Sequence, residues 1–217
     1  MSMLTYLPVL AEAATTSIMV SCLSLVVACA LSFAAGIPLY SGPAWLRGIA
    51  LVYVEIFRGT SLLVQLFWLY YALPLIGFSM PPLLTGVLAL GLNSGAYGAE
   101  VVRGALRAVP GQQHEAARAL NFSGAHTLWR IILPQAVPEM MPSFSSLAVQ
   151  NLKDTSLVSM ITIADLTFKA QELRNLTQDS VTVYATALLL YLAMALIFIG
   201  VLRFMERRIK VATGRSA

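Results

Sequence analysis

The chain has 217 residues, of which 58% are hydrophobic and 11% are charged, and its formal net charge is +4. An average soluble domain has roughly 25% charged residues, so this composition is typical of an integral membrane protein and excludes an ordinary soluble enzyme. Basic residues of membrane proteins gather in cytoplasmic loops, so the positive charge indicates orientation rather than a nucleic-acid partner.

The first predicted span covers residues 17–40 and carries no charge. It ends in Gly36-Ile37-Pro38, a combination that favours the end of a helix. A bilayer core about 30 Å thick needs about 20 mostly apolar residues per helix, so the whole chain has room for five or six such spans. No soluble domain fits beside them.

A charged pair interrupts the apolar pattern that follows. Glu55 and Arg58 precede Gly59, so we expect a bent helix that leads into a second span over residues 62–76. Prolines and a glycine then mark a short turn, because proline lacks the donor that a helix interior requires. The turn residues are Pro74, Gly77, Pro81 and Pro82.

The third predicted span covers residues 83–102. It contains Gly91 and Gly95 at the four-residue spacing that lets two membrane helices approach closely. We therefore expect this span to be a central, tightly packed helix.

The chain becomes polar over residues 103–137. This segment holds four arginines, two histidines and a single acid before residue 138, which places it in the cytoplasm. A fourth span is predicted over 138–160 and a fifth over 181–202, followed by a basic tail. Five spans put the N-terminus outside and the C-terminus in the cytoplasm, and the region 161–180, with three acids and two bases, is compatible with an external loop.

A motif stands in the polar segment. It reads Glu115-Ala116-Ala117, then Asn121, then Ile131 and Leu133-Pro134. This resembles the EAA loop of ABC import permeases, which has Glu-Ala-Ala, three residues, Gly, nine residues, Ile, one residue and Leu-Pro. The chain departs from that pattern only where Asn121 replaces the glycine.

Further segments resemble the polar amino acid branch of the same permeases. They are residues 53–60 with 62–65, residues 93–97 with 99–104, and Lys153-Asp154-Thr155-Ser156-Leu157. Ser61 stands where that branch usually has proline. Together the matches cover nearly the whole chain, and they imply a single all-helical transmembrane domain over 1–217 with the type I importer permease fold.

In that family the loop folds as two short helices joined by a sharp turn, and it docks in a groove of the ATPase. The turn needs a left-handed residue, a conformation that asparagine tolerates better than most residues. Small side chains permit close docking, and a carboxylate offers charge-assisted contacts. The resemblance implies eight coupling residues within 103–137: Glu115, Ala116, Ala117, Asn121, Gly124, Ile131, Leu133 and Pro134.

The energy source must lie in another chain. The sequence has no Gly-x-x-x-x-Gly-Lys-[Ser/Thr] phosphate loop, so we expect a non-catalytic subunit without its own cofactor. The resemblance implies a partner ATPase dimer that holds ATP and Mg, a second permease subunit, identical or homologous, and an external solute-binding protein. It also implies the bacterial inner membrane and a polar amino acid or related zwitterion, including compatible solutes and opines, as cargo.

Nine polar residues in or beside the spans are candidates for a gate or a substrate pathway. Charged side chains that face lipid are costly, so these should face the bundle or a wet cavity. Pairing of Glu100 with Arg103, one turn away, is favoured over substrate contact, and amides can equally join helices. The candidates are Glu55, Arg58, Gln65, Asn93, Glu100, Gln150, Asn151, Lys153 and Asp154.

Two other classes of function stay open at this point. An ion channel would conduct without an ATPase, and an intramembrane enzyme would lose activity with one acid. The chain shows no nucleophile with its base, and His114 and His126 lack further ligands at metal spacing. The coupling-loop match argues against both alternatives and against a metal site.

Overall fold

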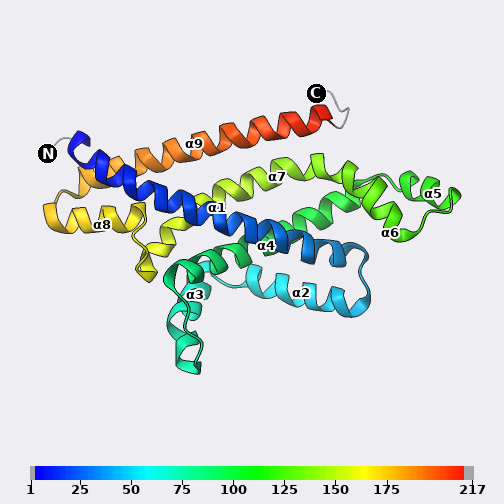
Figure 1. Cartoon of the computed structure of the whole chain (residues 1–217), viewed down its shortest axis with the longest axis horizontal. Helices are drawn as coiled ribbons and strands as arrows, with labels where there is room; N and C mark the ends of the chain where they lie inside the picture. Colours follow the sequence, from blue (N-terminus) through cyan, green and yellow to red (C-terminus); the bar gives the residue numbers. More distant parts are fainter. Residues whose placement is uncertain (1–2, 213–217) are drawn as a thin grey trace.

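The structure, a computed structural model, describes residues 3–212, and every element in this range is helical. Four long helices lie side by side along the molecule (Figure 1). They are α1 (Met3–Ser41), α4 (Pro82–Ala108), α7 (Leu133–Asp154) and α9 (Ser180–Ala212). The predicted all-α fold is confirmed.

Helices α1 and α4 form the closest pair. A Cβ atom added at Gly91 would lie 2.7 Å from Val27 of α1, and one added at Gly95 would lie 2.9 Å from Leu31 Cβ of α1. Only glycine fits at these two positions, so the predicted close packing of this segment is confirmed.

Helix α1 is longer than the predicted span 17–40. It begins at Met3 because Tyr6, Leu10 and Ala14, each one turn apart, are buried against α8 and α9. Pro38 lies inside the helix and does not stop it, since a proline in the last turn removes only one backbone hydrogen bond. The helix ends at Ser41, before Gly42 and Pro43.

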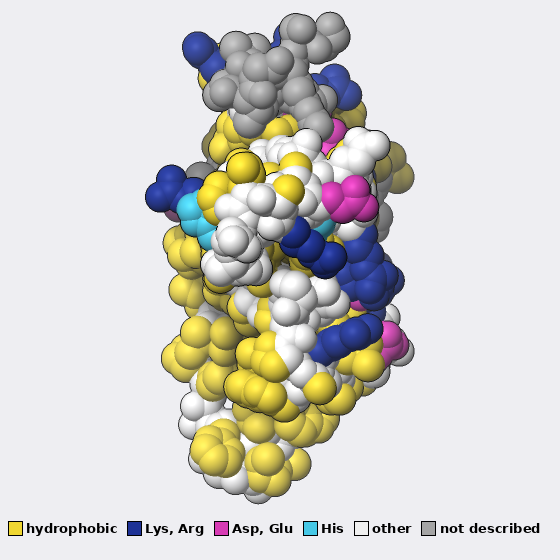
Figure 2. Space-filling view, turned by 90° about the vertical axis from the view of Figure 1, so that its right-hand side faces the viewer, with side chains coloured by type: hydrophobic (Ala, Val, Ile, Leu, Met, Phe, Trp, Pro, Cys, Tyr) yellow, Lys and Arg dark blue, Asp and Glu magenta, His cyan; other side chains and the backbone are white. Residues whose placement is uncertain are grey.

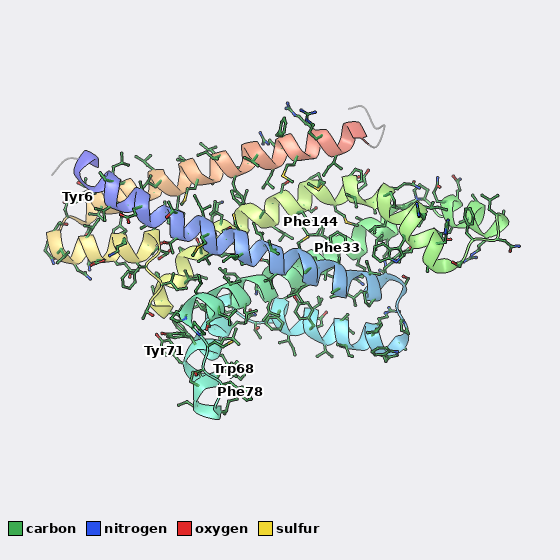
Figure 3. The ribbon with its side chains drawn as sticks, in the orientation of Figure 1. Tyr6, Phe33, Trp68, Tyr71, Phe78 and Phe144 are labelled. Atoms are coloured by element: carbon green, nitrogen blue, oxygen red, sulfur yellow. The ribbon has the colours of Figure 1, made fainter. Side chains whose placement is uncertain are left out.

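The predicted bend before residues 62–76 is confirmed. Helix α2 (Ala44–Gly59) meets the segment α3 (Leu62–Phe67), η1 (Trp68–Ala72) and η2 (Leu73–Ile76) at an angle of 104°. Thr60 and Ser61 are extended and break the helix between them. The segment 62–76 is shorter than the roughly 20 residues that cross a bilayer core. This segment and the turn that follows project from the bundle as an arm (Figure 3). Trp68, Tyr71 and Phe78 are exposed on the arm.

Short helices cap the two ends of the bundle. One end carries α5 (Gln112–Ala119), α6 (Gly124–Thr127) and η3 (Leu128–Ile132). The other carries α8 (Leu166–Thr177), beside the start of α1 (Figure 1). The predicted fourth span, 138–160, begins earlier in the structure, because α7 starts at Leu133. It continues after Asp154 as the 3-10 helix η4 (Thr155–Ile161).

Two of the described helices are long and apolar enough to cross a membrane alone, namely Tyr6–Ser41 and Ser180–Ile209. The bent pair of α2 with Leu62–Ile76 meets the same test when taken together. Helices α4 and α7 have 27 and 22 residues but are more polar. The count of five spans therefore stays a prediction.

Candidate functional site

The polar segment forms a helical hairpin, defined here as α5, the turn 120–123, and α6. Asn121 adopts φ of 59°, so the predicted left-handed residue at this turn is confirmed. Ser123 caps α6 by accepting a hydrogen bond from the backbone nitrogen of His126 over 3.3 Å. Gly124 begins α6 and does not adopt a left-handed conformation.

The motif residues divide between the inside and the outside of this hairpin. Glu115 and Ala116 are exposed, whereas Ala117 is only 1% exposed. The small side chain of Ala117 therefore serves packing within the chain, and it does not present a docking surface as the sequence suggested. Ile131 and Leu133 pack against the buried cluster around Val102, so the end of the motif joins the hairpin to α4, while Pro134 is exposed.

Sequence reasoning missed two exposed apolar residues at the turn. Leu120 is 66% exposed and Phe122 is 40% exposed, on either side of Asn121. Apolar residues that flank a polar turn are a signal that the sequence did contain. They give the hairpin an apolar tip at the end of the molecule where basic side chains and histidines are visible (Figure 2).

Two amide candidates hold the bend after α2. Gln65 Nε2 donates to the Phe57 carbonyl over 2.9 Å and to Thr60 Oγ1 over 2.7 Å. Asn93 Nδ2 donates to the same Phe57 carbonyl over 2.9 Å. Both amides bind the Phe57 backbone oxygen, which the broken helix leaves free, so both side chains are structural. Asn93 also lines a cavity, described below, whereas Gln65 does not.

A third amide candidate joins three helices. Asn151 Oδ1 accepts from Ser21 Oγ over 3.1 Å and from Ser24 Oγ over 2.9 Å, and its Nδ2 donates to Ser94 Oγ over 3.0 Å. Asn151 is fully buried. Its hydrogen bonds hold α1, α4 and α7 together, as expected for an amide that joins membrane helices.

The charged candidates form a network on α2 and α4. Arg103 Nε donates to Glu100 Oε2 over 3.0 Å, and Arg58 Nη1 lies 3.9 Å from Glu100 Oε1. The predicted pairing of Glu100 with Arg103 is confirmed. Arg58 also lies 5.2 Å above the ring of Tyr97. Glu55, another candidate, is exposed and forms no ion pair within the described residues, so the structure does not bring it into this network.

A cavity of about 620 Å³ lies between the start of α3, the middle of α4 and the end of α7. Gln150 Nε2 donates to Asp154 Oδ1 over 2.8 Å, and both side chains line it. Of the pathway candidates, the structure brings Asn93, Gln150 and Asp154 together here. Sequence reasoning missed Thr60, Ser94 and Tyr97, which also line this cavity.

Lys153 faces another region. It is exposed and lines a second cavity, of about 410 Å³, with Arg203 of α9. No ion pair between Lys153 and Asp154 lies within the described residues, as expected for neighbours that point about 100° apart around a helix. The cavity beside α3 and that beside α9 share Gln150 in their linings.

Helix α8, at the opposite end from the hairpin, is anchored by a buried acid. Asp165 is 0% exposed; its Oδ1 accepts from the Phe168 backbone nitrogen over 2.9 Å and its Oδ2 from the Tyr191 hydroxyl over 3.3 Å. Burial raises the pKa of this carboxyl to about 6, although its hydrogen bonds favour the charged form. Leu166 N also donates to Ser17 Oγ over 3.2 Å, so α8 is tied to α1 and α9.

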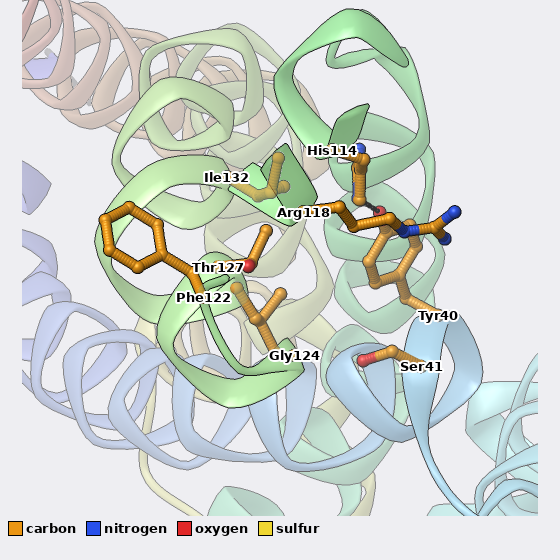
Figure 4. Close-up of a pocket in the computed structure, with 9 residues that line it drawn as sticks. Tyr40, Ser41, His114, Arg118, Phe122, Gly124, Thr127 and Ile132 are labelled. Carbon is orange, nitrogen blue, oxygen red and sulfur yellow. Dashed lines mark hydrogen bonds between the residues drawn. The ribbon is translucent and has the colours of Figure 1, made fainter. Parts of the chain in front are cut away.

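In the part of the chain that the structure describes, no group of three or more histidine, cysteine, aspartate or glutamate side chains could hold a metal ion. His114 instead meets α1: its Nε2 lies 2.8 Å from the hydroxyl of Tyr40. The two residues line a cavity at the base of the hairpin (Figure 4).

Comparisons with known proteins agree on the class of the chain. Residues 27–211 match the family described as binding-protein-dependent transport system inner membrane component. The probable amino-acid ABC transporter permease protein y4tF of Sinorhizobium fredii (strain NBRC 101917 / NGR234) is 54% identical over 207 residues, covering 93% of this chain and 87% of that protein.

Two further matches extend over nearly the whole chain. The glutamine transport system permease protein GlnP of Escherichia coli (strain K12) is 32% identical, with 94% of each chain covered. A solved structure described as that of an amino acid ABC transporter with histidines superposes with a TM-score of 0.87 at 32% identity, covering 95% of this chain and 96% of the other.

Proposed function

Since this chain belongs to the binding-protein-dependent transport system inner membrane components and is a non-catalytic, multi-pass permease subunit of an ABC importer, we propose that its cargo is a polar amino acid or a related zwitterion. ATP hydrolysis takes place in a separate chain. The ion-channel and intramembrane-enzyme alternatives gain no support from the matches.

The cavity between α3, α4 and α7 supports this cargo. Its volume of about 620 Å³ lies within the range of small-molecule sites, roughly 300–1,000 Å³. Asp154 can accept hydrogen bonds from an ammonium group, and Gln150 and Asn93 supply amides beside it. A carboxylate with amides and hydroxyls in a wet cavity fits a small zwitterion better than an apolar solute.

The exposed charges on this face support a second permease subunit. Arg58 is 39% exposed in its side chain, and a guanidinium that faces lipid inside a membrane is costly. A second copy or a homologous subunit, placed over this face, would enclose the polar cavity as a pathway and leave lipid in contact only with apolar surfaces.

The hairpin supports docking on an ATPase dimer, which would hold the ATP and Mg. Glu115 and Ala116 on its outer face, with Leu120 and Phe122 at its tip, offer a carboxylate beside apolar surface. The basic residues of α4 and α9 near this end support its placement in the cytoplasm, with the N-terminus outside. The external binding protein would then dock at the end that carries α8.

The proposed coupling to an ATPase depends on the hairpin, with its left-handed Asn121 and its apolar tip at the end of a helical bundle. The proposed cargo depends on the polar cavity between α3, α4 and α7. The test is to purify the chain with its ATPase and binding protein, reconstitute the complex in vesicles, and measure uptake from a panel of labelled solutes. We expect uptake of one or more polar amino acids that requires ATP and the binding protein. A binding protein that takes only sugars or metals would refute the cargo.

A further inference from the structure

A cavity of about 450 Å³ lies where the end of α1 meets the hairpin. Tyr40 and Ser41 of α1, His114 and Arg118 of α5, and Thr127 of α6 contribute the polar part of its lining (Figure 4). Phe122 of the docking tip also lines the cavity, but the proposed coupling function uses none of these polar side chains. Their polar atoms could serve a ligand of their own.

The cavity carries an uncompensated positive charge. Arg118 is exposed and has no ion-pair or hydrogen-bond partner within the described residues, although Glu115 stands one turn earlier on the same helix. No acidic side chain is among the lining residues. A guanidinium beside hydroxyl and imidazole groups, with no carboxylate, is suited to a phosphate oxygen.

An apolar groove of about 430 Å³ adjoins this cavity, because the two share Ser41, Gly124 and Leu128 in their linings. The rest of the groove consists mainly of Ile37, Pro38, Gly42, Leu46, Ala125 and Trp129, from the end of α1, the start of α2, and the helices α6 and η3. The ligand that fits both spaces therefore has an anionic head and an apolar tail.

The depth of the pair of cavities matches a membrane surface. Both lie at the end of α1, where the long apolar helix Tyr6–Ser41 stops. Trp45 and Trp129 are both exposed near this level. Tryptophan is enriched where hydrocarbon meets water, and basic pockets between membrane helices on the cytoplasmic side bind anionic head groups.

We propose that this site binds an anionic phospholipid, with its phosphate against Arg118, Ser41 and the Tyr40–His114 pair, and one acyl chain in the groove beside Trp129. The lipid would connect α1 to the hairpin from outside the bundle. The proposed placement of the hairpin in the cytoplasm would put this lipid in the inner leaflet. The binding itself is independent of the cargo and of the ATPase.

The test uses Trp129 as the reporter. The sequence has three tryptophans, so W45F/W68F in the full chain leaves Trp129 alone. This chain is reconstituted in phosphatidylcholine vesicles with increasing amounts of either phosphatidylglycerol or phosphatidylcholine that carries brominated acyl chains, which quench tryptophan fluorescence. We expect stronger quenching by brominated phosphatidylglycerol than by brominated phosphatidylcholine at equal fractions.

Two matched variants locate the charge. Arg118→Gln should weaken the apparent affinity for brominated phosphatidylglycerol about tenfold, the effect of losing one charge-assisted contact, without changing quenching by brominated phosphatidylcholine. Arg130→Gln, an exposed arginine of the same region outside both linings, should leave both unchanged. Because both arginines are exposed, both variants should keep the unfolding temperature of the parent.

Four outcomes would overturn the proposal. Equal quenching by the two lipids would mean that no head group is selected, and equal weakening by Arg130→Gln would mean a diffuse charge effect. Arg118-dependent thermal protection by inorganic phosphate in detergent, together with equal lipid quenching, would assign the cavity to a free anion. Loss of the ATPase in Arg118→Gln with unchanged quenching would assign Arg118 to a protein partner.

Discussion

The hairpin α5–α6 and the helix α8 cap opposite ends of the same bundle but are attached in different ways. Each region has non-glycine residues in the left-handed conformation. They are Asn121, at φ 59° in the turn of the hairpin, and Thr162 and Gln178, at φ 66° and 56° before and after α8. The hairpin is held by a small buried side chain, Ala117, and by the contact of His114 with Tyr40. Helix α8 is held by a buried carboxylate, that of Asp165, with partners on two elements.

This difference separates two tasks. A buried, hydrogen-bonded acid fixes α8 in one position against α1 and α9, which suits a rigid platform. The hairpin has few such bonds and presents Leu120 and Phe122 outward, so part of its apolar surface is left for a partner. Changes at the hairpin should therefore act on coupling, and changes at α8 should act on stability.

The largest effect is expected from Ala117→Trp. A buried alanine has no room for an indole, so the hairpin should lose its packing, transport should be abolished and the ATPase released, while the spans remain inserted. Transport, ATPase retention and membrane insertion are measured on the same reconstituted sample. Ala117→Ser, which is close to alanine in size, is the control and should retain most transport. Failure of Ala117→Trp to insert would place this residue in the core of the whole bundle instead.

A smaller effect is expected from pH at the other end. The pKa of Asp165 is raised from 3.8 to about 6, so the folded chain binds a proton that the unfolded chain has already lost between these values. Stability should therefore fall as pH rises from about 4 to about 6, by on the order of 3 kcal/mol, and stay level above. The measurement is the unfolding temperature in detergent across this range. Asp165→Asn should remove the fall in unfolding temperature between about pH 4 and about pH 6. The same pH profile in Asp165→Asn as in the parent chain would contradict the raised pKa of Asp165.

The smallest effect is expected from the hairpin turn. Asn121→Val places a β-branched residue at a positive φ, which costs about 1–2 kcal/mol of local stability. Asn121→Gly should be neutral or slightly stabilising in the fold. Hydrogen exchange of residues 112–127 compares the two variants, and equal protection of both would contradict the strain at this turn.

Local patterns in the sequence were enough for several features. The spacing of Gly91 and Gly95 predicted the close approach of α4 to another helix, the motif placed the left-handed residue at Asn121, and the one-turn spacing predicted the pairing of Glu100 with Arg103. Each of these depends on neighbours along one helix or one turn. Because the determinants are local, the order of residues along the chain is enough to predict them.

The features that sequence reasoning missed depend on distant partners. The bend after α2 was predicted, but the part of Asn93 in holding it was not, because the Phe57 carbonyl that it binds is 36 residues away. Asn151 is structural because Ser21 and Ser24 of another helix donate hydrogen bonds to it. Asp165 anchors α8 because the hydroxyl of Tyr191, on α9, donates a hydrogen bond to it. The spacing of residues along the chain does not predict contacts between distant helices. A pathway role and a structural role of Asn93 and Asn151 therefore could not be separated from the sequence.

The central claim is that the hairpin, rather than the opposite end, transmits the work of the ATPase. Leu120→Ser and Leu176→Ser make the matched pair, since Leu120 is 66% exposed at the hairpin tip and Leu176 is 75% exposed on α8. The direct measurement is ATP-driven amino acid uptake, with ATPase retention, in vesicles that contain the reconstituted complex. Leu120→Ser should lose most uptake and release the ATPase, while Leu176→Ser should keep the ATPase bound. Normal uptake by Leu120→Ser with the ATPase retained, or equal loss of the ATPase in both variants, would contradict the account.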